Sequence, residues 1–207
     1  MKLRRMAFVV RKTLPRALRV LMLRVLPISV LRRDTLKLEL GSGRSPSDGF
    51  LHCDGYLAPH IDFVFDLERR WIFPLACADT IRAYHLIEHF SHRSVQAVVA
   101  RWVASLKPGG VLELKTPNFR WIAERYAKSD IVTFHDTYPW MKEFDLFGIL
   151  FGGQENKYNI HKNAFDRERL ESLLLSAGCG SVEVIAENYE LHVIGHKGAS
   201  GVTKPPQ

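Results

Sequence analysis

The chain has 207 residues, 46% of them hydrophobic and 25% charged, which is the composition of one soluble globular domain with a real core. The net charge of +7 is concentrated in residues 1–33, which hold ten of the 29 Lys and Arg residues and no acidic residue. Residues 34–207 therefore carry 19 basic against 22 acidic side chains, a balance of −3, so no basic groove for a nucleic acid is expected.

The first 33 residues form a basic leader. Its stretch "LPRALRVLMLRVL" has a helical period, with an apolar face and a basic face. No apolar run approaches the roughly 20 residues of a spanning helix, and no secretory cleavage pattern is present. Three alternatives remain open. Residues 11–26 could contact an anionic membrane as an in-plane helix, pack against the domain, or belong to a mitochondrial presequence.

From residue 34 to residue 197 the pattern alternates strands and helices in one domain. The predicted strands are 36–40, 50–53, 61–65, 80–85, 111–116, 181–186 and 191–196. The predicted helices are 92–106, with Ser91 as its N-cap and a Pro-Gly-Gly turn after it, then 118–129 and 166–178. This alternation predicts an α/β fold with a mostly parallel sheet covered by helices on both faces.

Two segments lie outside that pattern. The aromatic-rich interval 131–165 is too long for a plain connection, which predicts a lid or specificity pocket, with a small satellite core as the alternative. Residues 198–207 are expected to be a disordered tail. The three cysteines are widely spaced and form no CxxC pair, so a reducing compartment is expected rather than a disulfide framework.

A glycine turn follows the first predicted strand, where open parallel sheets bind ligands. Gly41 and Gly43 would let a ligand approach the backbone closely. The turn lacks the Gly-Lys-Ser/Thr of an NTPase phosphate loop. It also fails the dinucleotide fingerprint, because Pro46 replaces the third glycine and Asp54 follows Gly43 too soon for an intervening helix. A nucleotide ligand without a pyrophosphate remains.

Five motifs carry a more specific resemblance. "LELGSG", "HCDGY", "DFVFDLE", "DTIRAYHLIEHF" and "SLKPGGVLELKTPN" occur in the order and spacing of the class I S-adenosylmethionine (SAM)-dependent methyltransferases. Over residues 36–196 the chain resembles the small bacterial type whose first helix is reduced to a loop. The resemblance implies a Rossmann-like, seven-stranded sheet with a C-terminal antiparallel strand, and SAM as cofactor.

The resemblance also implies a cofactor site. Glu39 and the loop backbone would lie near the methionine part of SAM, and Asp54 would accept hydrogen bonds from the ribose hydroxyls. Asp66, with Leu67, would face the adenine. For both aspartates the alternative is a carboxylate that caps a turn. The implied cofactor-binding set is Glu39, Gly41, Ser42, Gly43, Asp54, Asp66, Leu67 and His85.

The letters "HLIEH" at 85–89 match the H-x-x-E-H pattern of inverted zinc proteases. That chemistry needs both histidines on one helix, whereas "TIRAY" before them predicts a strand, so no metal is expected. The resemblance instead places His85 and Glu88 on the pocket floor near the sulfonium, with His89 structural. His161 is the candidate general base, because an imidazole accepts a proton at neutral pH; a hydrogen-bonded structural role is its alternative.

The sequence thus predicts SAM-dependent methyl transfer to an unidentified acceptor, such as a small molecule, a sugar or a lipid-linked glycan. The alternative is a catalytically inactive SAM-fold binding module at a membrane surface, because Ser45 stands where the usual third motif glycine would be. The expected location is cytoplasmic, with possible peripheral contact at the inner membrane face through the leader.

Overall fold

The computed structural model describes residues 34–44, 46–128 and 146–198. The leader, the first half of the 131–165 interval and the tail 199–207 lie outside the described residues. The membrane contact predicted for residues 11–26 therefore stays a prediction. Among the described residues, no helix has both the length and the apolar character needed to cross a membrane.

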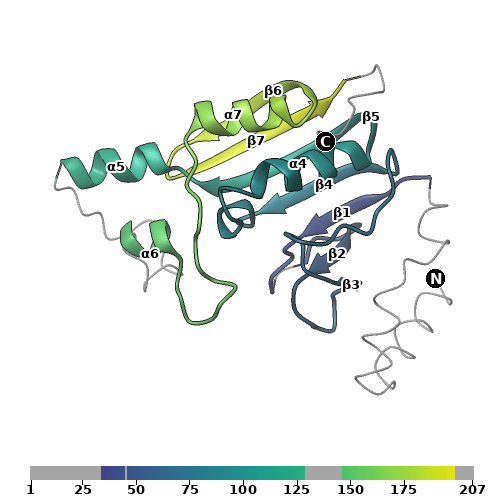
Figure 1. Cartoon of the computed structure of the whole chain (residues 1–207), viewed down its shortest axis with the longest axis horizontal. Helices are drawn as coiled ribbons and strands as arrows, with labels where there is room; N and C mark the ends of the chain where they lie inside the picture. The colour runs from purple at the N-terminus through teal and green to yellow at the C-terminus, as the bar shows by residue number, and fades with distance from the viewer. Residues whose placement is uncertain (1–33, 45, 129–145, 199–207) are drawn as a thin grey trace.

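Seven strands form one mixed sheet, in the order β3-β2-β1-β4-β5-β7-β6 (Figure 1). The strands from β3 to β5 pair in parallel, and β7 runs antiparallel to both β5 and β6. This arrangement confirms the predicted α/β class, with its mostly parallel sheet and C-terminal antiparallel strand, whereas the covering of both faces by helices stays a prediction. The strand bounds are β1 Lys37–Leu40, β2 Leu51–Asp54, β3 Phe63–Val64, β4 Ala78–Tyr84, β5 Leu106–Pro117, β6 Cys179–Glu187 and β7 Glu190–Lys197.

Within the described ranges, five helical segments accompany the sheet: η1 Ile87–His89, α4 Val95–Ser105, α5 Phe119–Ala127, α6 Leu146–Phe151 and α7 Arg167–Ser176. The helices predicted at 118–129 and 166–178 are confirmed. The Asn118 and Asp166 side chains cap α5 and α7 by accepting backbone N–H groups three residues on. Neither η1 nor α6 was predicted, because each is too short to show a helical period.

The prediction that Ser91 is the N-cap of a helix beginning at residue 92 is wrong. Residues 92–94 form turns, and α4 begins at Val95. The Ser91 hydroxyl accepts the N–H of Arg93, while the Glu68 carboxylate accepts the N–H of Ser91 and the hydroxyl of Ser94. The Glu68 carboxylate, distant in sequence, therefore holds the turn that precedes α4. Such a contact leaves no signal in the local sequence.

The predicted Pro-Gly-Gly turn is part of β5 instead of a separate connection. Leu106 already pairs with Ala78, and the next pair is Val111 with Thr80, so four residues bulge out between them. A Cβ at Gly110 would lie 2.9 Å from the Lys107 carbonyl oxygen, which explains why a glycine stands there.

The main core lies between the sheet and two helices, α4 and α7, which cover the same face (Figure 1). Trp102 of α4 and Leu170 of α7 are fully buried there against Leu112 and Leu114 of β5. A second small cluster of Ile122, Leu146 and Ile149 joins α5 to α6. The cluster contains none of the described aromatic residues of the interval, because Phe147, Phe151 and Tyr158 are about half exposed, so the predicted satellite core of aromatic rings is not seen in the described part of the interval.

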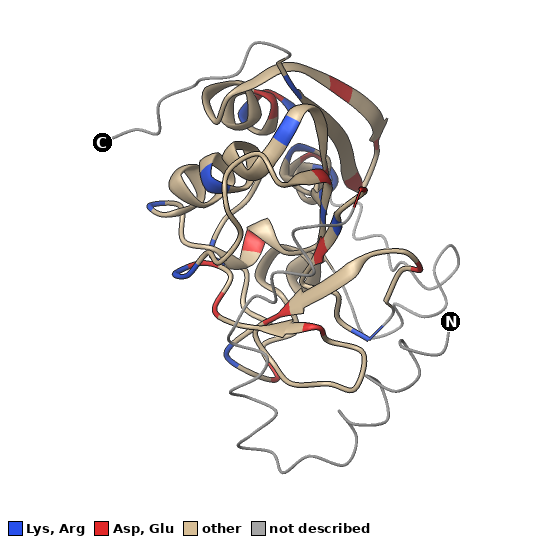
Figure 2. Ribbon diagram, turned by 90° about the vertical axis from the view of Figure 1, so that its right-hand side faces the viewer, with Lys and Arg blue, Asp and Glu red and all other residues tan. Residues whose placement is uncertain are grey.

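The opposite face of the central strands carries polar side chains, because successive strand residues point to opposite sides. Glu113 of β5 accepts from Arg82 Nε at 2.8 Å and pairs with His192 Nε2 at 3.0 Å, and the Tyr84 hydroxyl also donates to it. Figure 2 shows acidic and basic residues interspersed over the described chain. This agrees with the near balance of charge in residues 34–207.

We expect Leu170→Ala to lower the free energy of unfolding by about 2–5 kcal/mol, because it leaves a cavity in the main core. Leu175→Ala, on the same helix, is the matched control, since that side chain is 51% exposed and its loss leaves no cavity. Urea unfolding measures both. Equal effects of the two substitutions would contradict the described packing of α7.

Candidate active site

The candidate site lies where the order of the strands reverses. From β1 the chain moves outward through β2 and β3, then returns to place β4 on the other side of β1. The segments after β1, β2 and β4 therefore leave the same edge of the sheet side by side, which is where open α/β sheets bind ligands. Gly41, Asp54 and His85 stand at these three strand ends.

The loop after β1 has a backbone that requires glycine. Gly41 and Gly43 have φ values of +65° and +56°. A Cβ at Gly41 would also lie 2.9 Å from Cδ1 of Leu86, so the loop packs directly on the segment after β4. The Gly43 carbonyl accepts from the Tyr56 hydroxyl and lies 2.9 Å from His60 Nε2, which must carry the proton.

Asp54 braces this loop. Its carboxylate accepts the backbone N–H of Gly43 at 3.1 Å and of Gly55 at 2.6 Å. Burial raises the pKa of Asp54, and these backbone donors oppose that rise. Glu39, at the inner side of the loop, accepts from the Ser47 N–H at 2.9 Å and from the Ser47 hydroxyl at 2.6 Å. The Asp54 and Glu39 carboxylates therefore hold the loop in place by hydrogen bonds.

Asp66 and Leu67, which were predicted to face the adenine, occupy a turn after β3. The exposed Asp66 carboxylate accepts the N–H groups of Glu68 and Arg69, and Leu67 is buried in the main core. Both aspartates thus cap local backbone, as their alternative roles required. Contacts of either aspartate with a nucleoside stay a prediction.

His85 is a strained cation at the end of β4. Its φ is +49°, a conformation that non-glycine residues rarely adopt and that often marks functional sites. Its Nε2 lies 2.6 Å from Glu190 Oε2, and its Nδ1 lies 3.4 Å from Glu88 Oε1. Burial alone would lower the pKa of His85, but the two carboxylates raise the pKa to about 10. At neutral pH this side chain can donate hydrogen bonds but cannot act as a base.

Glu88 is a buried carboxylate on η1. Thr116 of β5 donates its hydroxyl to Oε2 at 3.1 Å, whereas Oε1 has no hydrogen-bond partner among the described residues. Burial raises the pKa of Glu88, but the neighbouring His85 outweighs it, and the pKa falls below its usual value. The carboxylate therefore remains ionised inside the protein.

The residues after His161 hold it beside Glu88. The Glu88 backbone carbonyl accepts the N–H groups of Lys162 and Asn163 at 2.8 and 3.1 Å, which fixes this irregular segment on η1. Gly152 makes room, because a Cβ there would lie 3.0 Å from His161 Cδ2. Burial lowers the pKa of His161, so its imidazole is neutral at physiological pH.

A cavity of about 300 Å³ opens over these side chains. His85, Glu88 and His161 all line it. Their predicted roles at the sulfonium and as general base stay predictions. The remaining lining residues are His89, Pro117, Gly148, Ile149, Gly152, Asn159 and Tyr189. His89 and Glu190 were missed as site residues. Antiparallel pairing of β5 with β7 sets Glu190 beside Pro117, a contact with no local sequence signal.

The fold matches many solved structures. The CurJ carbon methyltransferase has a TM-score of 0.51 and 15% identity, covering 84% of this chain and 50% of its own. An O-methyltransferase family protein from Burkholderia thailandensis has a TM-score of 0.52 and 16% identity, covering 88% and 56%. A SAM-dependent methyltransferase from Methanosarcina mazei has a TM-score of 0.51 and 16% identity, covering 86% and 100%.

This chain has the fold of the class I SAM-dependent methyltransferases. It spans about half the length of the first two of these proteins and the whole length of the third. No protein-family model and no curated protein sequence matches it. In this fold the glycine loop packs on Leu86, which follows the cavity residue His85 in the chain, whereas Gly41, Gly43 and Asp54 do not line the cavity itself.

We expect Gly41→Ala to destabilise the protein more than Gly49→Ala does. Both positions have positive φ, so both substitutions carry a strain of roughly 1–2 kcal/mol. Only Gly41 adds a clash, with Leu86, whereas nothing lies within 4 Å of a Cβ at Gly49. Urea unfolding separates the two effects, and equal losses would contradict the packing of Leu86 on the loop.

Glu190→Gln should lower the pKa of His85 by roughly 1–3 units, because it removes the nearest negative charge. Titration of the His85 ring by NMR measures this shift.

The raised pKa of His85 also means that its ion pair with Glu190 stabilises the fold fully below about pH 6.5. This contribution is lost as pH rises through about 10. Glu187→Gln is the control, since Glu187 pairs with Arg167. An unchanged titration in Glu190→Gln would refute the assigned pairing.

Proposed function

We propose that this protein transfers a methyl group from SAM to an acceptor held in the cavity over His85, Glu88 and His161. The observation that carries the proposal is the contact of Gly41 with Leu86. Through it the glycine loop packs on the segment of residues 85–89, and His85, Glu88 and His89 of that segment line the cavity. A ligand lying along the loop would thus present one end to that cavity.

The residues present fit such a cofactor. Glycines with positive φ expose the loop backbone, and Glu39 and Asp54 supply carboxylate acceptors at adjacent strand ends. SAM supplies a methyl group that is already activated by its sulfonium. The chain must therefore align the acceptor with that methyl group and exclude water.

The cavity residues divide the remaining work. His161 is neutral and can accept the proton of an oxygen or nitrogen nucleophile. His85 is held in its cationic form by Glu190 and Glu88, which face its two ring nitrogens, so it provides a fixed positive charge at the cavity. The cavity volume suits a small molecule or one sugar unit, including the end of a lipid-linked glycan. Peripheral membrane contact of the leader, on the cytoplasmic side, would suit the last of these.

A second candidate function has its own support. Both carboxylate oxygens of Asp54 already accept backbone N–H groups, and the Tyr56 hydroxyl donates to the Gly43 carbonyl. The loop is thus closed on itself, and Ser45 replaces the usual third glycine. An inactive binding module with this fold would have no need to open the loop for SAM.

Calorimetry with SAM and S-adenosylhomocysteine distinguishes the two. We expect both to bind the full chain with micromolar affinity, and Asp54→Asn to weaken binding roughly tenfold or more, because a charged hydrogen-bond acceptor is lost. Asp48→Asn, in the exposed part of the same loop, is the matched control. An absence of heat with the wild-type chain would favour the inactive module.

A further inference from the structure

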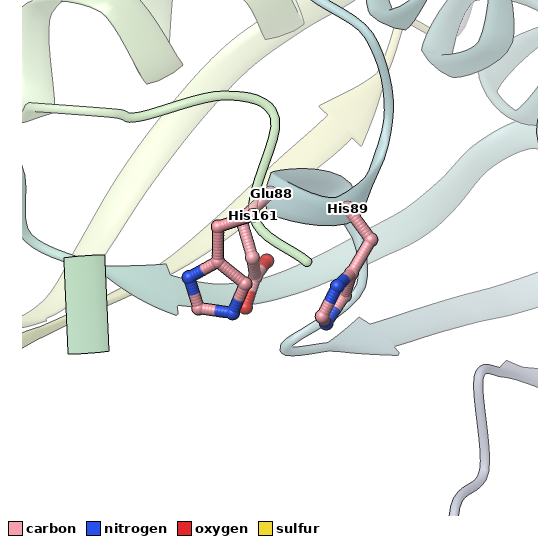
Figure 3. Close-up of side chains that lie close together, drawn as sticks. All are labelled: Glu88, His89 and His161. Atoms are coloured by element: carbon pink, nitrogen blue, oxygen red, sulfur yellow. The ribbon is translucent and has the colours of Figure 1, made fainter. Parts of the chain in front are cut away.

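Three potential metal ligands meet beside the cavity. One ligand atom from each of Glu88, His89 and His161 lies within 4.8 Å of the other two. Figure 3 shows both imidazole rings extending to the same side of η1, with the Glu88 carboxylate beside them. The ring centroids of His89 and His161 are 4.7 Å apart and nearly perpendicular, so the rings meet edge to face.

His89 is oriented as metal ligands usually are, and the backbone fixes His161. His89 Nδ1 lies 3.2 Å from the Ile160 carbonyl oxygen, and the backbone N–H of His161 donates to the Phe151 carbonyl at 3.0 Å. A histidine that binds a metal typically donates its other ring N–H to such a carbonyl, which fixes the tautomer and the ring orientation. The remaining nitrogen of the His89 ring is then an unprotonated acceptor.

The Glu88 carboxylate supplies an independent indication of a ligand. Its side chain is only 2% exposed, and it lines the same cavity as the two histidines. Thr116 satisfies Oε2, but Oε1 has no hydrogen bond among the described residues and only an ion-pair contact of 3.4 Å with His85. Buried polar atoms in proteins are almost always hydrogen-bonded, so a carboxylate oxygen whose nearest partner is an ion-pair contact of 3.4 Å can accept a further ligand.

We propose that Glu88, His89 and His161 bind a divalent transition-metal ion, with its open coordination positions facing the cavity. Two imidazoles and one carboxylate form a ligand set that suits Zn²⁺ and its neighbours rather than Mg²⁺ or Ca²⁺. The ligand atoms of a tetrahedral Zn²⁺ site lie ~3.3 Å from one another. Side-chain rotations that move each of the three ligand atoms by about 1 Å would bring them to that spacing.

This site differs from the one that the letters "HLIEH" suggest. His85 is engaged by Glu190 at 2.6 Å and does not belong to the cluster. The second histidine ligand is His161, which comes from the segment after α6. Three protein ligands and open positions are characteristic of catalytic metal sites, where the ion binds an oxygen of the substrate. As a ligand, His161 could not also serve as a general base.

Metal titration of the full-length chain tests the proposal. We expect chelator-treated protein to bind one equivalent of Zn²⁺ in competition with a chromophoric chelator, and to give a cobalt spectrum of low coordination number with Co²⁺. Loss of a second-shell partner alone costs about 10–100-fold, so His89→Ala and His161→Ala should each weaken binding by at least about 100-fold. His196→Ala, at a half-exposed histidine on β7, should bind like the wild type.

Two results would overturn the site. One is wild-type protein that fails to bind one equivalent of Zn²⁺. The other is equal Zn²⁺ affinity in the His89→Ala, His161→Ala and His196→Ala variants, because the ion would then be bound by scattered surface histidines. Thermal unfolding without metal confirms that each variant is folded, and Glu88→Gln is avoided because this side chain is buried. SAM calorimetry on the metal-free chain is a separate readout, so failure of this inference and failure of methyl transfer remain distinguishable.

Discussion

The arrangement of the site depends on one buried charge, the Glu88 carboxylate. An ionised carboxylate inside a protein is costly unless charged or hydrogen-bonded partners surround it. Here His85 comes from the end of β4 and Thr116 from β5, while the backbone carbonyl of Glu88 binds the segment of residues 162–163. One residue therefore joins the sheet edge to the segment after α6, and the cavity forms where they meet.

Much of the fold could be predicted from the sequence because its signals are local. Alternating apolar residues mark the strands, Asp166 caps α7, and the two glycines of the first loop have the positive φ that their position implies. The errors occur where distant contacts decide the structure. Glu68 delays the start of α4, and the pairing of β4 with β5 draws the Pro-Gly-Gly residues into a bulged strand.

The site was predicted only in part for the same reason. Family resemblance placed His85 and Glu88 on the pocket floor, and imidazole chemistry made His161 the candidate base; the structure brings all three to one cavity. Glu190 could not be foreseen, because it reaches His85 through antiparallel pairing across 105 residues. His89 was taken as structural, since nothing in "HLIEH" shows that its ring faces a histidine from a remote loop.

The two cavity histidines differ because their surroundings differ. His85 lies between two carboxylates and stays protonated, whereas His161 is half-buried beside Glu88 alone, and its desolvation outweighs that charge and lowers its pKa. A neutral imidazole can accept a proton or bind a metal ion, and a cationic one can do neither. Both proposed roles of His161 therefore require the same burial, and the carboxylates that surround His85 restrict it to donating hydrogen bonds.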